Sequence, residues 1–180
     1  MNKGRIKTDN SFLKSKINLR LNHLPDKDEI RILDCFAGES VIWKAIKSQT
    51  AKKTTILSID KKPYSLLRGD NIRYLKVLNL DSYDIIDLDS YGIPFSQLEV
   101  LFQRGYRGII FITFTQSIMG GLPKKMLQFL GYPKSMIEKC PTLLYRNGLE
   151  KFKLYLAKQG IKKIYIIRKN TKYYICIDKT

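Results

Sequence analysis

Three aspartates, Asp34, Asp60 and Asp89, each stand at the end of a short run rich in apolar and β-branched residues. Such runs, bounded by turn residues, are typical of buried strands in a parallel sheet. A carboxylate at a strand end can accept hydrogen bonds from hydroxyl or amine groups, and it attracts positive charge. Because parallel strands end at the same edge of a sheet, we expect the three aspartates to share one binding site.

The residues after Asp34 indicate a tight turn followed by a helix over residues 41–46. Ala37 and Gly38 are small enough to let the backbone pass close to a ligand. The hydroxyl of Ser40 can cap the helix by accepting from a free backbone N–H. The remaining free N–H groups of the first turn then face whatever lies above the strand end.

This segment resembles motif I of the S-adenosylmethionine (SAM)-dependent methyltransferases with a Rossmann-like core, in the form Asp-x-Phe-Ala-Gly-x-Gly. Asp34, Phe36, Ala37 and Gly38 match, and Ser40 takes the place of the last glycine. The resemblance implies that the four matching residues bind SAM. The serine narrows the room for the carboxylate of the cofactor.

Asp60 follows Asp34 at a distance that accommodates one βαβ unit. It resembles the acid of motif II, which implies that it holds the ribose hydroxyls of SAM. The alternative is an ordinary polar residue where a strand reaches the surface. Further along, Asp70 or Asn71 resembles the third acidic motif, near the adenine, although Gly69-Asp70-Asn71 is also a good turn and helix cap.

The segment 87–92 resembles motif IV of methyltransferases that act on exocyclic amines, in particular the Asp-Leu-Asp-Pro-Phe/Tyr-Gly form of the tRNA guanine-N2 dimethyltransferases. Ser90 replaces the proline. The resemblance implies that Asp87 belongs to the cofactor site and that Asp89 and Tyr91 are catalytic. Asp89 would accept a hydrogen bond from the amine and orient it for direct in-line methyl transfer, while Tyr91 stacks on an extruded base. The alternative is a strand-end acid and a packing tyrosine.

The charge of the chain favours a polyanionic partner. Lysine and arginine total 33 against 16 acidic residues, a net charge of +17. We expect nucleic acid, RNA rather than DNA, contacted through the basic N- and C-terminal segments; the alternative is charge that only keeps the protein soluble. Residues 77–103 carry five acids and no lysine or arginine. This acidic stretch suits a sulfonium cofactor and an amine substrate.

Several other classes of protein fit the sequence poorly. No apolar run approaches the roughly 20 residues of a membrane span, and no signal region is evident, so a cytoplasmic location is expected. Cys35, Cys140 and Cys176 are scattered, so we expect neither a metal site nor disulfides. His23, the one histidine, lies beside an expected turn, which disfavours histidine-dependent nucleophilic catalysis. A Gly-x-Gly-x-x-Gly motif is missing, which counts against an NAD-dependent oxidoreductase.

The elements that must position these residues form one α/β domain. We expect a Rossmann-like, seven-stranded, mostly parallel sheet with helices on both faces and a C-terminal antiparallel β-hairpin, as in the methyltransferase core. Residues 1–29 form a basic segment on or near the cofactor site, and residues 30–180 form the methyltransferase domain. Residues 117–147, interrupted by glycine and proline, are either a substrate-facing insert or a plain connector.

Together these features predict a SAM-dependent methyltransferase acting on an exocyclic amine of a nucleobase in RNA (tRNA or rRNA) or DNA. A different class stays open, because Ser40 and Ser90 depart from the family motifs. In that alternative, the chain binds nucleic acid on a methyltransferase scaffold without turnover.

Overall fold

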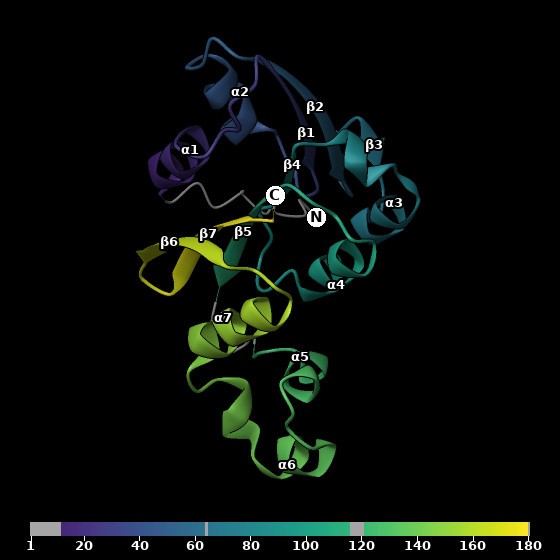
Figure 1. The fold of residues 1–180 in the computed structure, drawn as a ribbon, viewed down its shortest axis with the longest axis vertical. Helices are drawn as coiled ribbons and strands as arrows, with labels where there is room; N and C mark the ends of the chain where they lie inside the picture. The colour runs from purple at the N-terminus through teal and green to yellow at the C-terminus, as the bar shows by residue number, and fades with distance from the viewer. Residues whose placement is uncertain (1–11, 64, 116–120, 180) are drawn as a thin grey trace, which may run out of the picture.

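In the computed structural model, which describes residues 12–63, 65–115 and 121–179, a seven-stranded sheet has the order β3-β2-β1-β4-β5-β7-β6 (Figure 1). The strands are β1 (Glu29–Asp34), β2 (Lys53–Asp60), β3 (Leu67–Arg68), β4 (Ile85–Leu88), β5 (Ile109–Thr115), β6 (Lys163–Lys169) and β7 (Lys172–Asp178). Neighbours from β3 to β5 are parallel, whereas β7 is antiparallel to β5 and β6. The predicted Rossmann-like sheet with a C-terminal hairpin is confirmed.

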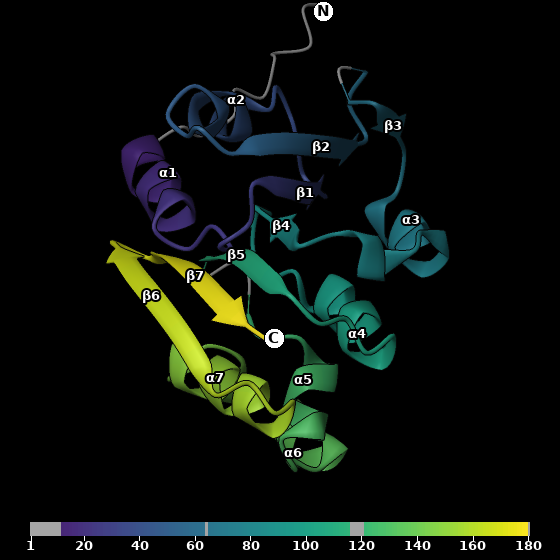
Figure 2. The ribbon, with the colours of Figure 1, turned by 45° about the horizontal axis from the view of Figure 1, so that its top comes forward.

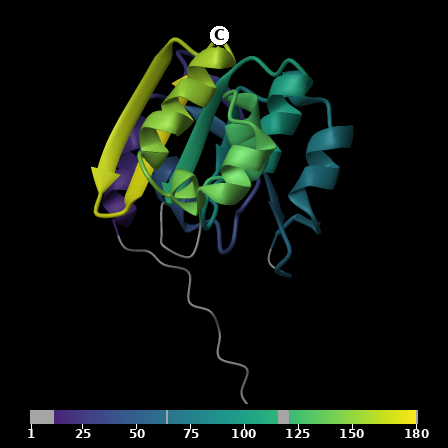
Figure 3. The same ribbon diagram turned by 90° about the horizontal axis from the view of Figure 1, so that it is seen from below.

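Helices cover both faces of the sheet, as predicted (Figure 2). The helical segments are α1 (Leu13–Leu21), α2 (Val41–Lys47), α3 (Asn71–Val77), η1 (Leu80–Ser82), α4 (Phe95–Gln103), α5 (Lys124–Phe129), α6 (Lys134–Lys139), η2 (Pro141–Leu144) and α7 (Gly148–Lys158). One buried cluster joins α3, α4, α5 and α7 to the sheet, and a second joins α1 and α2 to the other face. Figure 3 shows α4 and α7 in front of the sheet and α1 behind it.

The register of the central strands explains why the aspartates converge. β4 is buried along its whole length, as expected for a parallel strand covered on both faces. Asp34, the last residue of β1, lies opposite Asp87 of β4. Asp60 is the last residue of β2, and Asp89 follows β4 directly. The carboxyl ends of these three strands therefore bring the acids to one edge of the sheet.

The N-terminal helix α1 lies against α2 and β7. Ile17 and Leu19 are buried in the cluster on that face of the sheet. Lys16 and Arg20 of the same helix are also buried and point toward the edge that carries the aspartates. The basic residues 1–11, which we expected to contribute to nucleic-acid binding, lie outside the described residues.

Residues 121–147 form α5, α6 and η2 beside α7, at the end of the molecule away from β3 (Figure 1). Leu122, Met126 and Ile137 join the larger hydrophobic cluster. None of these described residues lines the cleft discussed below. Residues 117–120 of the expected insert are not among the described residues. Across the described part of the chain, no helix has the length and apolar character that crossing a bilayer requires.

Ser40 starts α2 with a left-handed backbone, at φ 54°, and its side chain makes no capping hydrogen bond. The predicted hydroxyl cap is therefore wrong, because the backbone turn, not the side chain, determines how this helix begins. A residue with a β-carbon in this conformation costs about 1–2 kcal/mol. Glycine, the residue of the family motif, has no such cost.

We therefore expect Ser40→Gly to raise the free energy of unfolding by about 0.5–1 kcal/mol, because relief of strain exceeds the added chain entropy of glycine. Urea unfolding measures the change. Ser48→Gly is the matched control, since Ser48 follows the other end of α2 with φ −78° and has no such strain. Equal effects of the two substitutions would contradict the explanation.

Candidate active site

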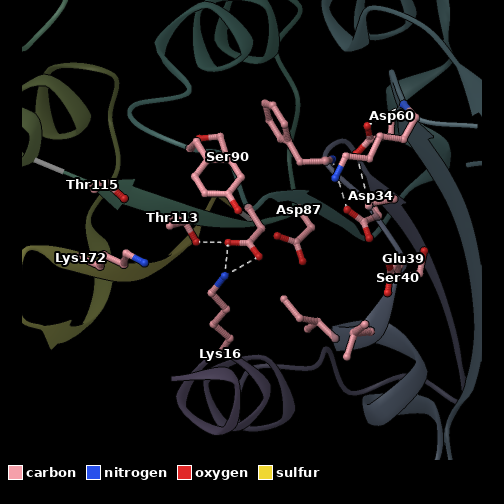
Figure 4. Close-up of a pocket in the computed structure, with 18 residues that line it drawn as sticks. Lys16, Asp34, Glu39, Ser40, Asp60, Asp87, Ser90, Thr113, Thr115 and Lys172 are labelled. Carbon is pink, nitrogen blue, oxygen red and sulfur yellow. Dashed lines mark hydrogen bonds and ion pairs between the residues drawn. The ribbon is translucent and has the colours of Figure 1, made fainter. Parts of the chain in front are cut away.

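A cleft lies at the carboxyl edge of the sheet (Figure 4), and all three predicted aspartates are among the residues that line it. Asp34 comes from β1, Asp60 from β2 and Asp89 from the turn after β4. Further walls come from α1, from the turn after β1, and from β5 and β7. The cleft therefore sits where the first, second and fourth strands end, as the sequence predicted.

The turn after β1 is tied across to the end of β2. The backbone N–H of Gly38 donates to Asp60 Oδ2 at 2.8 Å, and the N–H of Ala37 donates to the carbonyl of Ile59 at 3.2 Å. Asp60 Oδ1 accepts from the N–H of Lys62 at 2.9 Å. Each oxygen of Asp60 thus keeps room for a further hydrogen bond, since a carboxylate oxygen can accept two.

Asp87 is held by a buried ion pair. Arg20 donates from Nε to Asp87 Oδ2 and from Nη2 to Oδ1, both at 2.7 Å, and Trp43 Nε1 donates to Oδ2 at 2.8 Å. The side chains of Arg20 and Asp87 are each 1% exposed, and the guanidinium lies over the Phe111 ring. Asp87, which the sequence assigned to the cofactor site, is part of the cleft wall but has its carboxylate engaged by protein groups.

Asp89 receives two partners that the sequence did not single out. Lys16 Nζ donates to both carboxylate oxygens, at 2.9 Å to Oδ1 and 2.7 Å to Oδ2, and Thr113 Oγ1 donates to Oδ1. Burial by itself raises the pKa of Asp89, but the charges of Arg20 and Lys16 and the hydrogen bonds from Lys16 and Thr113 bring it below the usual value. Asp89 is therefore ionised at neutral pH.

The residues after Asp89 face different surroundings. Tyr91 lines the cleft and is 73% exposed, which places it at the mouth. Ser90 also lines the cleft but is buried, and its Oγ finds no hydrogen-bond partner among the described residues.

Asp34 is 4% exposed and lies between the other acids of the cleft. Burial raises its pKa well above the usual value, and the negative charges of Asp87 and Asp89 raise it further. The backbone N–H of Phe36 donates to Asp34 Oδ1 at 3.3 Å. Asp34 therefore holds a proton more readily than an exposed aspartate does.

No protein-family model and no curated protein matches this chain. Solved structures do. A SAM-dependent methyltransferase from Archaeoglobus fulgidus is 15% identical with a TM-score of 0.56, and the match covers 94% of each chain. A ribosomal protein L11 methylase from Lactobacillus delbrueckii subsp. bulgaricus is 13% identical with a TM-score of 0.57, covering 93% of this chain and 78% of that one. A precorrin-6y C5,15-methyltransferase from Geobacter metallireducens is 10% identical with a TM-score of 0.55, covering 99% and 92%.

The chain has the class I SAM-dependent methyltransferase fold. The strand order, the antiparallel β7 and the full-length structural matches agree on this point. Identities this low concern the fold alone, and the named proteins act on different kinds of substrate. The activity of this chain must be argued from its own cleft.

Asp70 and Asn71 lie away from the lining of the cleft in this methyltransferase fold. The carboxylate of Asp70 caps α3 by accepting from the N–H of Ile72 at 3.0 Å. Asn71 donates from Nδ2 to the carbonyl of Cys35 at 2.8 Å and accepts from Gln97 at 2.9 Å. The structure thus shows the helix cap that the sequence offered as the alternative, and Asn71 fastens α3 to the end of β1.

Three residues of this site, Lys16, Arg20 and Thr113, were not predicted from the sequence. Lys16 and Arg20 belong to the basic segment 1–29, for which the sequence predicted no individual contacts. A usable signal was present in α1, since its two buried cations flank the apolar Ile17 and Leu19 on the same side of the helix. Among the described residues, no group of three or more His, Cys, Asp or Glu side chains is placed to hold a metal ion.

Proposed function

We propose that this chain is a SAM-dependent methyltransferase that methylates an exocyclic amine of a nucleobase. The observation that carries the proposal is the convergence of Asp34, Asp60 and Asp89 in one cleft of this fold. They follow the order of the family motifs along the chain, and each stands at the strand end where its motif belongs.

The residues of the cleft fit the cofactor. Asp60 has acceptor capacity left on both oxygens, which suits two ribose hydroxyls. Asp34 and the backbone of Phe36, Ala37 and Gly38 line the cleft beside it, where they suit the methionine part and its amino group. When bound, SAM supplies a methyl group on a positively charged sulfur. The cluster of carboxylates favours that charge.

Asp89 is suited to the amine. The lone pair of an exocyclic amine is delocalised into the base, so the amine is a poor nucleophile until it is oriented. An ionised Asp89 accepts one amine hydrogen and turns the lone pair toward the methyl group. Tyr91 at the mouth offers a face on which an extruded base can stack.

A nucleic acid is the acceptor that the charge of the chain favours. The net charge is +17, and Lys62 and Lys172 line the cleft beside the acids. Phosphates close to the target base would meet these lysines. RNA is preferred over DNA because residues 87–92 resemble the motif of the tRNA enzymes.

The test is transfer of labelled methyl groups from SAM to total tRNA, rRNA and DNA. We expect incorporation into RNA, with the label on an exocyclic amine after digestion to nucleosides. Binding of SAM and of RNA without incorporation would support the alternative of a scaffold without turnover. Incorporation into protein or small molecules alone would contradict the choice of substrate.

Binding of SAM is expected to depend on pH through Asp34. A cation beside Asp34 favours its ionised form, so SAM binding lowers the raised pKa of Asp34 and releases a proton. The affinity for SAM should therefore increase as the pH rises from acidic toward neutral. Calorimetry in buffers of different ionisation enthalpy measures the released proton.

Asp34→Asn removes the titrating group, so proton release should disappear and the affinity should lose most of its pH dependence in the acidic range. Asp81→Asn is the control, because Asp81 is exposed and outside the cleft. Proton uptake by the wild-type protein in place of release would contradict the assignment.

A further inference from the structure

The carboxylate of Asp89 is surrounded by charged groups from several elements. Its side chain is 14% exposed and that of Lys16 is 11% exposed, so water screens this ion pair weakly. The facing groups are Lys16 and Arg20 of α1, Asp34 of β1, Asp87 of β4, Thr113 of β5, Lys172 of β7 and Tyr91 in the adjoining turn. Lys16 reaches Asp89 from α1 and Thr113 reaches it from β5, and dashed lines in Figure 4 mark the hydrogen bonds of these two labelled residues.

The two oxygens of Asp89 have different numbers of partners. Oδ1 accepts from both Lys16 and Thr113, which uses its two acceptor positions. Oδ2 accepts from Lys16 at 2.7 Å and has no other partner among the described residues. One acceptor position is therefore left on Oδ2, in a carboxylate whose orientation is fixed by two other elements.

We propose that Lys16 and Thr113 are positioning residues of the amine site, which saturate Oδ1 of Asp89 and so present Oδ2 as the acceptor for one N–H of the substrate. The substrate part of this inference rests on the proposed function. The positioning part rests on the hydrogen bonds alone. It extends the site to α1 and β5, which lie outside the segments that resemble family motifs.

The charges around Asp89 explain why Lys16 has a large effect on the ionisation of this carboxylate. Asp87 is a negative neighbour that disfavours a further carboxylate, and Arg20 already makes two hydrogen bonds to Asp87. Lys16 is the cation that contacts Asp89 directly. Without it, only the charge of Arg20 and the hydrogen bond from Thr113 would oppose the effect of burial, so the pKa of Asp89 would rise, and a protonated carboxyl accepts an amine hydrogen poorly.

The first experiment follows the titration of Asp89 by NMR in protein labelled with ¹³C at aspartate carboxyls, with Asp89→Asn to assign the signal. Lys16→Met should raise the pKa of Asp89 by about one unit or more, and Thr113→Val should raise it less. Lys16→Arg and Thr113→Ser should restore values near that of the wild type. Lys14→Met is the matched control, because Lys14 is an exposed residue of the same helix.

The second experiment measures methyl transfer by the same variants. We expect Lys16→Met to lower kcat at least tenfold, to leave the KM for SAM within about twofold, and to move the acidic limb of the pH profile to higher pH. Lys16→Arg should recover most of kcat. A variant that only loosened the fold would not shift the pH profile or be rescued by arginine.

Two results would overturn the inference. One is an Asp89 titration in Lys16→Met that equals that of the wild type. The other is faster methyl transfer by Lys16→Met, which would mean that Lys16 blocks the carboxylate of Asp89 until the substrate displaces it. If the wild-type protein transfers no methyl group, the proposed function fails, and the titration of Asp89 still decides whether Lys16 and Thr113 control this carboxylate.

Discussion

Asp89→Asn is expected to lower the rate of methyl transfer by about 100- to 1,000-fold, the usual effect of removing one group that stabilises a transition state. Asparagine keeps the size of the side chain but loses the charge that attracts the amine hydrogens. The affinity for SAM should stay within about threefold, because Asp60 and the turn after β1, the groups that we propose hold SAM, are unchanged. Single-turnover transfer with saturating SAM measures the chemical step.

The control for this prediction is Asp81→Asn, which makes the same change at an exposed position outside the cleft. It should transfer methyl groups at the wild-type rate. Equal rates for the wild type and Asp89→Asn would remove Asp89 from the mechanism. A loss of SAM binding in Asp89→Asn would instead assign this carboxylate to the cofactor.

Arg20→Met is expected to lower the free energy of unfolding by about 3–5 kcal/mol, because it leaves the buried charge of Asp87 without its ion-pair partner. The double variant Arg20→Met with Asp87→Asn should recover a large part of this loss. Asparagine removes the stranded charge and still offers an oxygen to Trp43 Nε1. Urea unfolding of the wild type, both single variants and the double variant gives the coupling energy.

An exposed ion pair provides the comparison. Lys27 pairs with Asp84, but its side chain is 60% exposed, so Lys27→Met should cost only about 0–1 kcal/mol. If Arg20→Met cost no more than Lys27→Met, the buried pair would not anchor α1 to the sheet. The position of Lys16 beside Asp89 would then need another explanation.

The parts of the fold that the sequence predicted are those encoded by local patterns. Apolar runs that end in an acid marked β1, β2 and β4, and their parallel pairing brings Asp34, Asp60 and Asp89 together. The expected C-terminal hairpin is formed by β6 and β7, which pair antiparallel. Strands and turns of this kind can be predicted from the local periodicity of apolar residues and from turn residues, without information on contacts between distant segments.

The parts that the sequence did not predict depend on contacts between distant segments. Lys16 meets Asp89 across 73 positions of the chain, and Arg20 meets Asp87 across 67. The segment that resembles motif IV contains Asp87 and Asp89 but not their partners. The sequence therefore predicted only a basic character for the segment that forms α1. The expected Ser40 cap was wrong for a different reason, because a side-chain preference cannot reveal that the backbone turns left-handed at that residue.

The central claim is that the cleft at the ends of β1, β2 and β4 binds SAM. Isothermal titration calorimetry of the wild-type chain with SAM, beside Asp60→Ala and the exposed-site control Asp81→Ala, tests it most directly. The account predicts one binding site per chain, the same affinity in Asp81→Ala, and an affinity at least about tenfold weaker in Asp60→Ala, which loses the acceptor for the ribose hydroxyls. No detectable heat at millimolar SAM, or equal affinities of the wild type and Asp60→Ala, would contradict it.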